Sequence, residues 1–173
     1  MTQSTKIRPG DPFPHFSWSL VGGETLDVAG ETGWRILVVY RGKHCPLCKR
    51  YFKALDSKLE MFREMGVSIF AVSADPKDKA EADVASEGWR FPVSYDMSLD
   101  DMRSLGLFIS TPRSEQETDR PFSEPGLFVI NRDGNTQTVQ VGNASYTRAD
   151  LDILLAGLKG TIEKGLPIRG TMI

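Results

Sequence analysis

Two cysteines, Cys45 and Cys48, are the only ones in this chain of 173 residues, and they lie three residues apart. They follow the apolar run 36–40 and begin the segment 45–65, whose apolar residues recur at helical spacing. Thiol chemistry depends on the thiolate, and the N-terminus of a helix stabilises a negative charge. The position of the pair therefore predicts a redox-active dithiol where a strand meets a helix.

The two thiols are expected to act in different ways. We expect Cys45, at the first helical turn, to have a lowered pKa and to be the nucleophile, with Cys48 donating a hydrogen bond to it. We expect Cys48, one turn further along, to be the more buried thiol and to resolve the mixed disulfide. Pro46 suits the first helical position, because its missing N–H would have no partner there. The cations close to the pair in the sequence are Arg41, Lys43, Lys49 and Arg50.

A metal site is the alternative chemistry for the same residues. His44, Cys45 and Cys48 would supply three ligands, whereas structural zinc takes four, and the only other histidine is His15. His44 either stabilises the Cys45 thiolate or covers the site, and His15 is expected to be packed or exposed. A disulfide between the two cysteines closes a small ring, worth roughly 2 kcal/mol in chain entropy, which suits a reversible bond. We therefore expect no metal and no cofactor.

Length and composition set the class of protein. A chain of this length, with 40% hydrophobic and 25% charged residues, is expected to form one domain over 1–173, with its core at 7–160 and a tail at 166–173. The net charge of −2 gives no reason to expect nucleic acid or a membrane as partner. No apolar run approaches the ~20 residues of a membrane span, and residues 1–6 lack the apolar core of a signal peptide. The expected location is cytoplasmic, where a close cysteine pair is more often catalytic than structural.

The order of predicted elements indicates an α/β fold with a mixed central sheet. In chain order we expect a short hairpin (16–20 and 24–28), a buried strand (36–40), a helix (45–65), a strand (67–74), a helix (80–89), a weak strand (92–95), a short helix (99–105), a hairpin (126–131 and 136–141) and a final helix from 147. This order implies parallel crossovers and helices on both faces of the sheet. The cysteine pair then lies at the C-terminal end of a central strand, where α/β proteins usually have their sites.

Local signals mark two helix starts and one long loop. Asp75 and Pro76 are expected to give an N-cap and a first-turn proline to the second helix. Thr147 is expected to begin the last helix in a capping-box arrangement with Asp150. Residues 110–125 are polar and contain several prolines. A loop of this length in a compact domain is usually functional or mobile.

Four segments carry motifs in a familiar order: 7–16 (IRPGDPFPHF), 41–48 (RGKHCPLC), 67–76 (VSIFAVSADP) and 126–134 (GLFVINRDG). The first, third and fourth resemble the G-D-x-x-P-x-F opening, the strand and turn after the first helix, and the F-x-I-D-x-x-G hairpin of peroxiredoxins. The second is similar to the R-G-x-W-C-P-x-C segment of peroxiredoxin-like proteins in the alkyl hydroperoxide reductase/thiol-specific antioxidant (AhpC/TSA) superfamily. The resemblance covers about 7–160 and implies a thioredoxin-like fold and an antioxidant oxidoreductase.

The chain departs from that family next to the nucleophile. Peroxiredoxins carry P-x-x-x-T-x-x-C, and counting back from Cys45 places Gly42 at the threonine and Val38 at the proline. Their distant arginine usually lies just before the late strand, where this chain has Pro125 and Gly126. Threonine and arginine polarise the peroxide in that family, so their absence, with the Cys-x-x-Cys pair and Pro125, favours disulfide exchange. The resemblance over the whole chain favours a hydroperoxide as oxidant, and we expect disulfide exchange slightly more. The candidates for a replacement guanidinium are Arg41, Arg113 and Arg120.

Pro125 has a second implication from the same resemblance. Thioredoxin-like oxidoreductases place a cis-proline before this strand, beside the dithiol. The resemblance therefore implies a cis bond between Glu124 and Pro125, with the backbone of Glu124 presented to an extended disulfide substrate. The alternative is an ordinary trans turn, since X–Pro bonds are cis in only about 5% of cases in folded proteins.

The sequence thus predicts a thiol-dependent oxidoreductase of the peroxiredoxin-like type, which uses a Cys45–Cys48 dithiol to reduce disulfides or hydroperoxides. The predicted supporting residues are Arg41, Gly42, Lys43, His44, Pro46, Glu124 and Pro125. The expected partner is an external dithiol donor of the thioredoxin or glutathione type, and a homodimer is left open. The alternative is a non-enzymatic metal-binding or scaffold protein on a redox fold.

Overall fold

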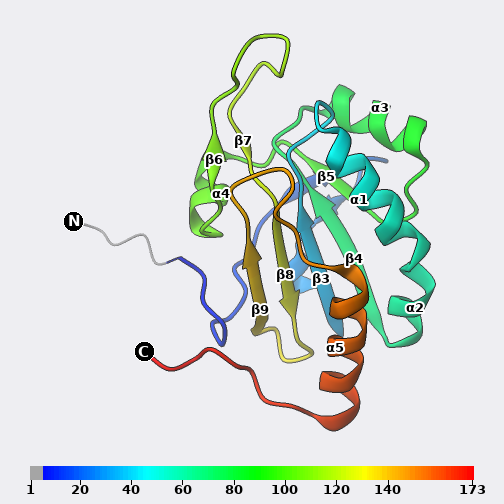
Figure 1. The fold of residues 1–173 in the computed structure, drawn as a ribbon, viewed down its shortest axis with the longest axis vertical. Helices are drawn as coiled ribbons and strands as arrows, with labels where there is room; N and C mark the ends of the chain where they lie inside the picture. The colour runs from blue at the N-terminus through cyan, green and yellow to red at the C-terminus, as the bar shows by residue number, and fades with distance from the viewer. Residues whose placement is uncertain (1–5) are drawn as a thin grey trace.

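The computed structural model describes residues 6–173, which form a seven-stranded sheet in the order β2-β1-β5-β4-β3-β8-β9 and a small sheet of β6 and β7 (Figure 1). The strands are β1 (Trp18–Leu20), β2 (Thr25–Leu26), β3 (Trp34–Val39), β4 (Val67–Val72), β5 (Val93–Tyr95), β6 (Ile109–Ser110), β7 (Phe122–Ser123), β8 (Gly126–Ile130) and β9 (Thr136–Val141). The helices are η1 (Val28–Gly30, a 3-10 turn), α1 (Pro46–Ser57), α2 (Leu59–Glu64), α3 (Lys77–Glu87), α4 (Leu99–Ser104) and α5 (Leu151–Lys164).

The predicted mixed sheet is confirmed by the strand directions. β3, β4 and β5 run parallel, whereas β1, β2, β8 and β9 pair antiparallel with their neighbours. Ile36 at the middle of β3 lies between Ile69 of β4 and Val129 of β8. β3 is therefore an inner strand, and the segment that follows it emerges from the centre of the sheet.

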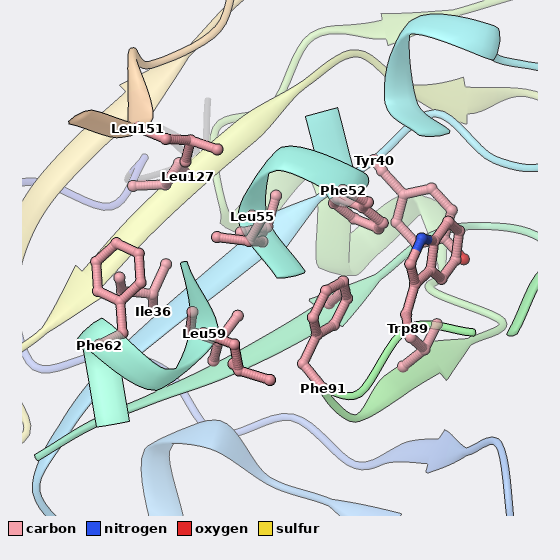
Figure 2. Close-up of a cluster of buried hydrophobic side chains, with 14 of the residues drawn as sticks. Ile36, Tyr40, Phe52, Leu55, Leu59, Phe62, Trp89, Phe91, Leu127 and Leu151 are labelled. Carbon is pink, nitrogen blue, oxygen red and sulfur yellow. The ribbon is translucent and has the colours of Figure 1, made fainter. Parts of the chain in front are cut away.

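Side chains of β3 alternate between two apolar clusters on opposite faces of the sheet. Ile36 and Tyr40 belong to the cluster covered by α1, α2 and α5, and Figure 2 shows the aromatic rings of Tyr40, Phe52, Trp89 and Phe91 close together in it. The ring centroids of Tyr40 and Phe52 are 4.9 Å apart. The opposite cluster contains buried residues of β3, α4 and the N-terminal segment: Leu37, Val39, Met102, Leu105, Phe13 and Trp18. This packing fixes α1 against the sheet.

The helix predicted over 45–65 is two helices, α1 and α2, divided at Lys58. Lys58 has φ −102° and ψ 0°, which interrupts the helix. Leu55, Leu59 and Phe62 nevertheless remain buried in one cluster across the division. The apolar spacing therefore predicted the buried face correctly but not the break.

Both predicted helix starts were wrong in detail. α3 has Pro76 as its N-cap with no side-chain cap, and the Asp75 carboxylate instead accepts a hydrogen bond from the backbone N–H of Lys43 at 2.6 Å. The N-cap of α5 is Asp150, whose carboxylate accepts from the N–H of Ile153, and the Thr147 hydroxyl donates to the carbonyl of Ala144. At α3 a contact made only after folding replaces the local cap, whereas at α5 the cap stays local but is Asp150 and not Thr147.

The long loop predicted at 110–125 is partly structured. Its end forms β7, which pairs with β6. The remaining residues, 111–121, extend at the same end of the molecule as the start of α1 (Figure 1). This places the loop on the side where the cysteines lie.

The two ends of the described chain approach each other. Thr171 lies against Gly10, and Gly170 lies near Pro9. Within residues 6–173, no helix has the length and apolar character needed to cross a membrane. Residues 1–5, part of the segment in which no signal peptide is expected, lie outside the described residues, so the single domain over 1–173 stays a prediction.

Candidate active site

Cys45 is the N-cap of α1. Its backbone is extended, and its Sγ accepts a hydrogen bond from the N–H of Cys48 at 3.2 Å. Pro46 occupies the first helical position, as predicted. The N–H of Cys45 donates to the carbonyl of Gly42 at 3.1 Å, so residues 42–45 form a turn. The sulfur therefore lies where the helix N–H groups and dipole favour a negative charge.

The surroundings of Cys45 favour the thiolate. The hydrogen bond from the Cys48 thiol contributes most to lowering the pKa of Cys45 to about 6. Burial acts in the opposite direction, and it is outweighed by the Arg41 side chain, the Cys48 N–H and the charge of Arg148. At neutral pH Cys45 is therefore mostly the thiolate, the reactive form.

Cys48 is the proton-bearing partner. Burial raises the pKa of Cys48 far above its ordinary value, and the hydrogen bond donated to Cys45 and the charge on Cys45 act in the same direction. The exposed fractions do not separate the two residues, since Cys45 is 0% exposed and Cys48 is 1% exposed. The prediction that Cys48 is the more buried thiol is thus not supported by the accessible surface. The two thiols differ in charge state instead.

Arg148 is a site residue that the sequence analysis missed. Its Nη2 lies 3.0 Å from Cys48 Sγ and 3.8 Å from Cys45 Sγ. It comes from the segment between β9 and α5, 100 residues after Cys48. No local motif marks it; the only signal was that a cation close to the start of α5 would lie near α1 if the two helices shared a face of the sheet.

Arg41 supplies a second guanidinium, on the Cys45 side. Its side chain helps to lower the pKa of the Cys45 thiol, and its Nε lies 3.0 Å from Glu124 Oε2. Glu117 of the long loop approaches the same guanidinium, with 3.6 Å between its Oε1 and Arg41 Nη2. Of the three predicted candidates, Arg41 is the one that reaches the sulfur. The carboxylates hold it in place from the loop and from the strand that precedes Pro125.

His44 covers the site as a neutral ring. It packs edge-on against Phe122, with 4.6 Å between ring centroids. Burial, followed by the charge of Arg41, lowers the pKa of His44 to about 4. A neutral imidazole does not supply positive charge to Cys45 at pH 7, so of the two predicted roles the structure favours covering the site.

Gly42 makes room for a carboxylate. Its φ is +129°, and a Cβ at this position would lie 2.7 Å from Asp75 Oδ1. The Asp75 carboxylate is buried and is held there by the N–H of Lys43. The position that is threonine in peroxiredoxins is therefore filled here by a side chain from the end of β4, and no hydroxyl can be added without displacing it.

The predicted cations other than Arg41 point elsewhere. Lys43 joins the site through its backbone, and its side chain is exposed. Lys49 Nζ lies 3.4 Å from the buried carboxylate of Asp83, and Arg50 is exposed. Closeness of a cation to a cysteine in the sequence thus predicted poorly which cations approach the sulfurs, because residues of one helix point in different directions.

The cis bond implied at Glu124–Pro125 is absent. The described chain contains no cis peptide bond, so this bond is trans. The backbone of Glu124 is already engaged, because its N–H donates to the carbonyl of Phe108 at 2.8 Å and its carbonyl accepts from the Ser123 hydroxyl. Glu124 contributes its carboxylate, through Arg41, and the carbonyl of Pro125 accepts from the N–H of Gly142.

The remaining residues that the sequence analysis considered for the site do not contact the cysteine sulfurs. Arg113 pairs with Glu117, and Arg120 pairs with Asp119. His15 pairs with Asp27 at 2.6 Å and does not join His44 and the cysteines. Among residues 6–173, no three or more His, Cys, Asp or Glu side chains are arranged to hold a metal ion.

An open pocket of about 710 Å³ lies beside Cys45. Arg41, His44 and Cys45 line one side, and Arg113 and Glu117 of the long loop line the other. Since Cys45 is 0% exposed, a substrate atom reaches its sulfur only after neighbouring side chains move. The pocket is polar and charged where a substrate would enter.

Comparison with models of known protein families gives a match that covers most of the chain. A family model described as "AhpC/TSA family" matches residues 9–139, well over half of the chain. The chain belongs to the AhpC/TSA family. The resemblance predicted from the four motifs is confirmed.

Relatives with assigned names come from two groups. A Mycobacterium tuberculosis H37Rv protein with the provisional name of a peroxiredoxin is 23% identical over 159 residues, which is 88% of this chain and 100% of the relative. The thiol-disulfide oxidoreductase ResA of Halalkalibacterium halodurans is 25% identical over 136 residues, 78% of this chain and 69% of the relative. This chain is thus similar both to a protein named as a peroxiredoxin and to proteins named as thiol-disulfide oxidoreductases.

Solved structures confirm the thioredoxin-like fold expected of the family. A peroxiredoxin-like protein from Aquifex aeolicus matches with a TM-score of 0.75 at 17% identity, over 90% of this chain and 88% of that one. A mutant of peroxiredoxin 6 of Arenicola marina matches with a TM-score of 0.74 at 20% identity, over 91% and 74%. The chain is accordingly a thiol-dependent oxidoreductase of the peroxiredoxin-like type. The non-enzymatic alternative is not favoured.

Proposed function

We propose that Cys45 is the nucleophile and Cys48 the resolving thiol of a dithiol that reduces disulfides. One observation carries this proposal: Cys45 Sγ, at the N-cap of α1, accepts a hydrogen bond from the N–H of Cys48 at 3.2 Å. The side chain of Cys48 also lowers the pKa of Cys45, whereas burial raises the pKa of Cys48. One thiol is therefore ready to attack while the other retains its proton. A two-step thiol exchange requires these two states, a thiolate for the first attack and a second thiol that resolves the mixed disulfide.

The exchange proceeds in two balanced steps. The Cys45 thiolate attacks one sulfur of the substrate disulfide, forming a mixed disulfide and releasing the first substrate thiolate. The Cys48 thiol then loses its proton, its sulfur attacks Cys45 Sγ, and the second substrate thiolate leaves. The protein finishes as the Cys45–Cys48 disulfide, two electrons having passed to the substrate.

The contact between Gly42 and Asp75 favours a disulfide as the main oxidant. A buried carboxylate occupies the space that a threonine at position 42 would need. The site consequently lacks, at that position, the hydroxyl that binds peroxide in the family it resembles. Relatives named as thiol-disulfide oxidoreductases support the same direction.

Arg41 favours hydroperoxide reduction as a second activity. Its guanidinium lines the same pocket as Cys45 and helps to lower the pKa of that thiol, so it can polarise a peroxide oxygen as the sulfur attacks. In that reaction Cys45 becomes a sulfenic acid, an alcohol or water leaves, and Cys48 condenses with the sulfenic acid to give the disulfide and water.

The same proposal names the partners and the compartment. A dithiol donor of the thioredoxin type, or glutathione, regenerates Cys45 and Cys48 by opening their disulfide. Such donors keep thiols reduced in the cytoplasm, where we place this protein. A homodimer remains a proposal for which sedimentation is the direct test.

The test is a stopped-flow comparison of two oxidants. Reduced protein is mixed with hydrogen peroxide or with a reducible protein disulfide such as insulin, and the loss of protein thiols is followed for the unaltered chain, Cys45→Ser and Cys48→Ser. We expect both reactions to vanish in Cys45→Ser. We expect Cys48→Ser to stop at a mixed disulfide with insulin, visible by mass spectrometry.

The outcomes separate the two activities. Oxidation by the disulfide well above the rate of a free thiol, with slow reaction toward peroxide, supports the main proposal. Fast oxidation by peroxide alone would make the second activity the function. Rates at the free-thiol level with both oxidants would overturn the proposal, and full activity in Cys45→Ser would overturn the assignment of the nucleophile.

A further inference from the structure

Arg148 brings a guanidinium to the buried sulfur of the resolving thiol. Its Nη2 is closer to Cys48 Sγ, at 3.0 Å, than to Cys45 Sγ, at 3.8 Å. The geometry is that of a charge-assisted hydrogen bond, which strengthens when the sulfur becomes negative. The charge of Arg148 also helps to lower the pKa of Cys45. The shorter contact, to Cys48 Sγ, is not used in the first attack and requires an explanation of its own.

The guanidinium is held in position from two sides. Its Nε donates to the carbonyl of Ser145 at 2.6 Å, and its Cζ lies 5.1 Å from the centre of the Tyr51 ring on α1. The Tyr51 hydroxyl donates to the carbonyl of Ala149, which ties the segment carrying Arg148 to the helix carrying Cys48. Arg148 is therefore oriented before any substrate binds.

Neighbouring cations are engaged with other groups. Arg41 lies on the Cys45 side and pairs with Glu124, and Lys49 pairs with Asp83. Within residues 6–173, Arg148 is the cationic side chain that hydrogen-bonds to Cys48 Sγ. If the Cys48 thiolate is stabilised by a side-chain charge, this residue supplies it.

Cys48 needs such help only after Cys45 has reacted. While Cys45 is the thiolate, burial, the hydrogen bond to Cys45 and the charge on Cys45 all keep the pKa of Cys48 high. Once Cys45 Sγ is bonded to a substrate sulfur, its negative charge is gone and it is a poor acceptor. Burial is then the main obstacle to a Cys48 thiolate, and Arg148 is the charge that opposes it.

We infer that Arg148 is a further catalytic residue, which stabilises the Cys48 thiolate in the steps where Cys48 carries the negative charge. The inference rests on the proposed roles of Cys45 and Cys48. In the resolving step Cys48 gives its proton to water, its sulfur bonds to Cys45 Sγ, and the substrate sulfur leaves with the electron pair. In regeneration a donor thiolate attacks Cys45 Sγ, and the electron pair of the broken S–S bond moves to Cys48 beside Arg148.

A symmetric aromatic disulfide, 5,5′-dithiobis(2-nitrobenzoate), separates the steps in one experiment. Attack by Cys45 releases one coloured thiolate, and resolution by Cys48 releases a second one. We expect Arg148→Gln to leave the first release within a few-fold of the unaltered protein. The second release should slow roughly tenfold or more at pH 7, because a charge-assisted hydrogen bond to a buried thiolate is lost.

The pH profile and two further variants define the role. In Arg148→Gln the second release should require a higher pH to reach its full rate, and Arg148→Lys should recover part of the loss by restoring the charge. Arg103→Gln is the matched control, because Arg103 is exposed and forms a surface ion pair with Asp100. It should show both releases unchanged.

Other results overturn the inference. An unchanged second release in Arg148→Gln would do so, and so would equal slowing of both releases, which would indicate a structural role or a role at Cys45. If Arg148→Gln fails to fold by circular dichroism, Arg148→Ala takes its place, and an unshifted pH profile of the second release at the full rate in that variant rejects the role. Failure of the proposed function gives a different result. The unaltered protein would then release one coloured thiolate and not two, or Cys48→Ser would release two and not one.

Discussion

Cys45 and Cys48 have the same side chain, yet the structure places a negative charge on one and a proton on the other. The difference comes from direction: hydrogen bonds from Cys48 converge on Cys45, whereas Cys48 is a donor in a more strongly desolvating environment. Each residue therefore creates the charge state of the other, and loss of one should move the pKa of its partner.

The pH dependence of alkylation tests this at the residue scale. With a pKa of about 6, Cys45 should react with iodoacetamide at a rate that rises with pH, reaches half its maximum near pH 6 and is nearly flat above pH 7. In Cys48→Ala the strongest of the stabilising hydrogen bonds is lost, so the midpoint should move to higher pH. The measurement is the second-order rate from pH 4.5 to 9.5, with the alkylated residue identified by mass spectrometry.

Cys45→Ser is the control for this profile, since it should leave no alkylation with a midpoint near pH 6. A midpoint of 8 or above in the unaltered protein would contradict the charge state assigned to Cys45. An identical midpoint in Cys48→Ala would contradict the role given to the Cys48 thiol.

At the scale of elements, the site depends on where α1, the end of β4 and the start of α5 meet. The turn 42–45 brings Cys45 to the N-terminus of α1. Asp75, just beyond β4, supports that turn through the N–H of Lys43, while the segment before α5 delivers Arg148. Each element contributes one group, so a small displacement of any of them should change the reactivity of the cysteine sulfurs.

Gly42→Ala tests the support from β4, with Gly22→Ala as the matched control. Both glycines have positive φ, +129° and +109°, but only Gly42 has neighbours within 4 Å of an added Cβ. The shared backbone strain costs about 1–2 kcal/mol, and the collision with the Asp75 carboxylate should add about 1–3 kcal/mol in Gly42→Ala only. Urea unfolding of the two variants measures the difference.

The second part of this prediction concerns reactivity. Displacing Asp75 also breaks its hydrogen bond with Lys43 N–H, so Gly42→Ala should slow alkylation of Cys45 whereas Gly22→Ala should not. Equal losses of stability in the two variants would show that the carboxylate moves aside without cost, and the proposed support would be wrong.

For the whole molecule, the redox state and the stability of the fold are linked through Cys45. Its pKa is about 6 in the folded protein against an ordinary value of 9.0, so ionisation stabilises the reduced fold above pH 6 and this gain is lost as the pH falls through 6. The oxidised protein has no thiol at this position and lacks the effect. Its disulfide instead adds roughly 2 kcal/mol in chain entropy at every pH.

We therefore expect the stability of the reduced protein, relative to that of the oxidised protein, to increase as the pH rises. The relative gain in the free energy of unfolding should be roughly 2 kcal/mol between pH 6 and pH 8. Cys48 contributes little in this range, since its raised pKa keeps it protonated in the folded state. Urea unfolding of both redox forms at the two pH values gives the difference, in which groups unrelated to the cysteines cancel.

A double variant, Cys45→Ser with Cys48→Ser, supplies the reference for pH effects elsewhere in the chain. If the gap between reduced and oxidised protein stays constant from pH 6 to pH 8, the thiolate is not stabilised by folding. A gap that changes in the opposite direction would require a thiol that is held neutral by folding, as Cys48 is, to dominate.

The sequence by itself determined the features that depend on neighbours along the chain. The apolar runs became β3 and β4, the Cys45–Pro46 step became the start of α1, and a spacing of three residues placed the Cys48 N–H on the Cys45 sulfur. Those contacts join residues within one helical turn, so their geometry follows once the helix forms. The family followed too, since its motifs are short segments of this kind.

Only the tertiary structure decided which charges reach the sulfurs. Arg148 contacts Cys48 from 100 residues away, and Asp75 leaves the helix it was expected to cap to meet a turn 32 residues earlier. Lys49 and Arg50, although close in sequence, turn away. The physical reason is that a charge acts through space over a few ångströms, and the order of strands in the sheet, with the docking of α5 beside α1, determines which side chains come that close.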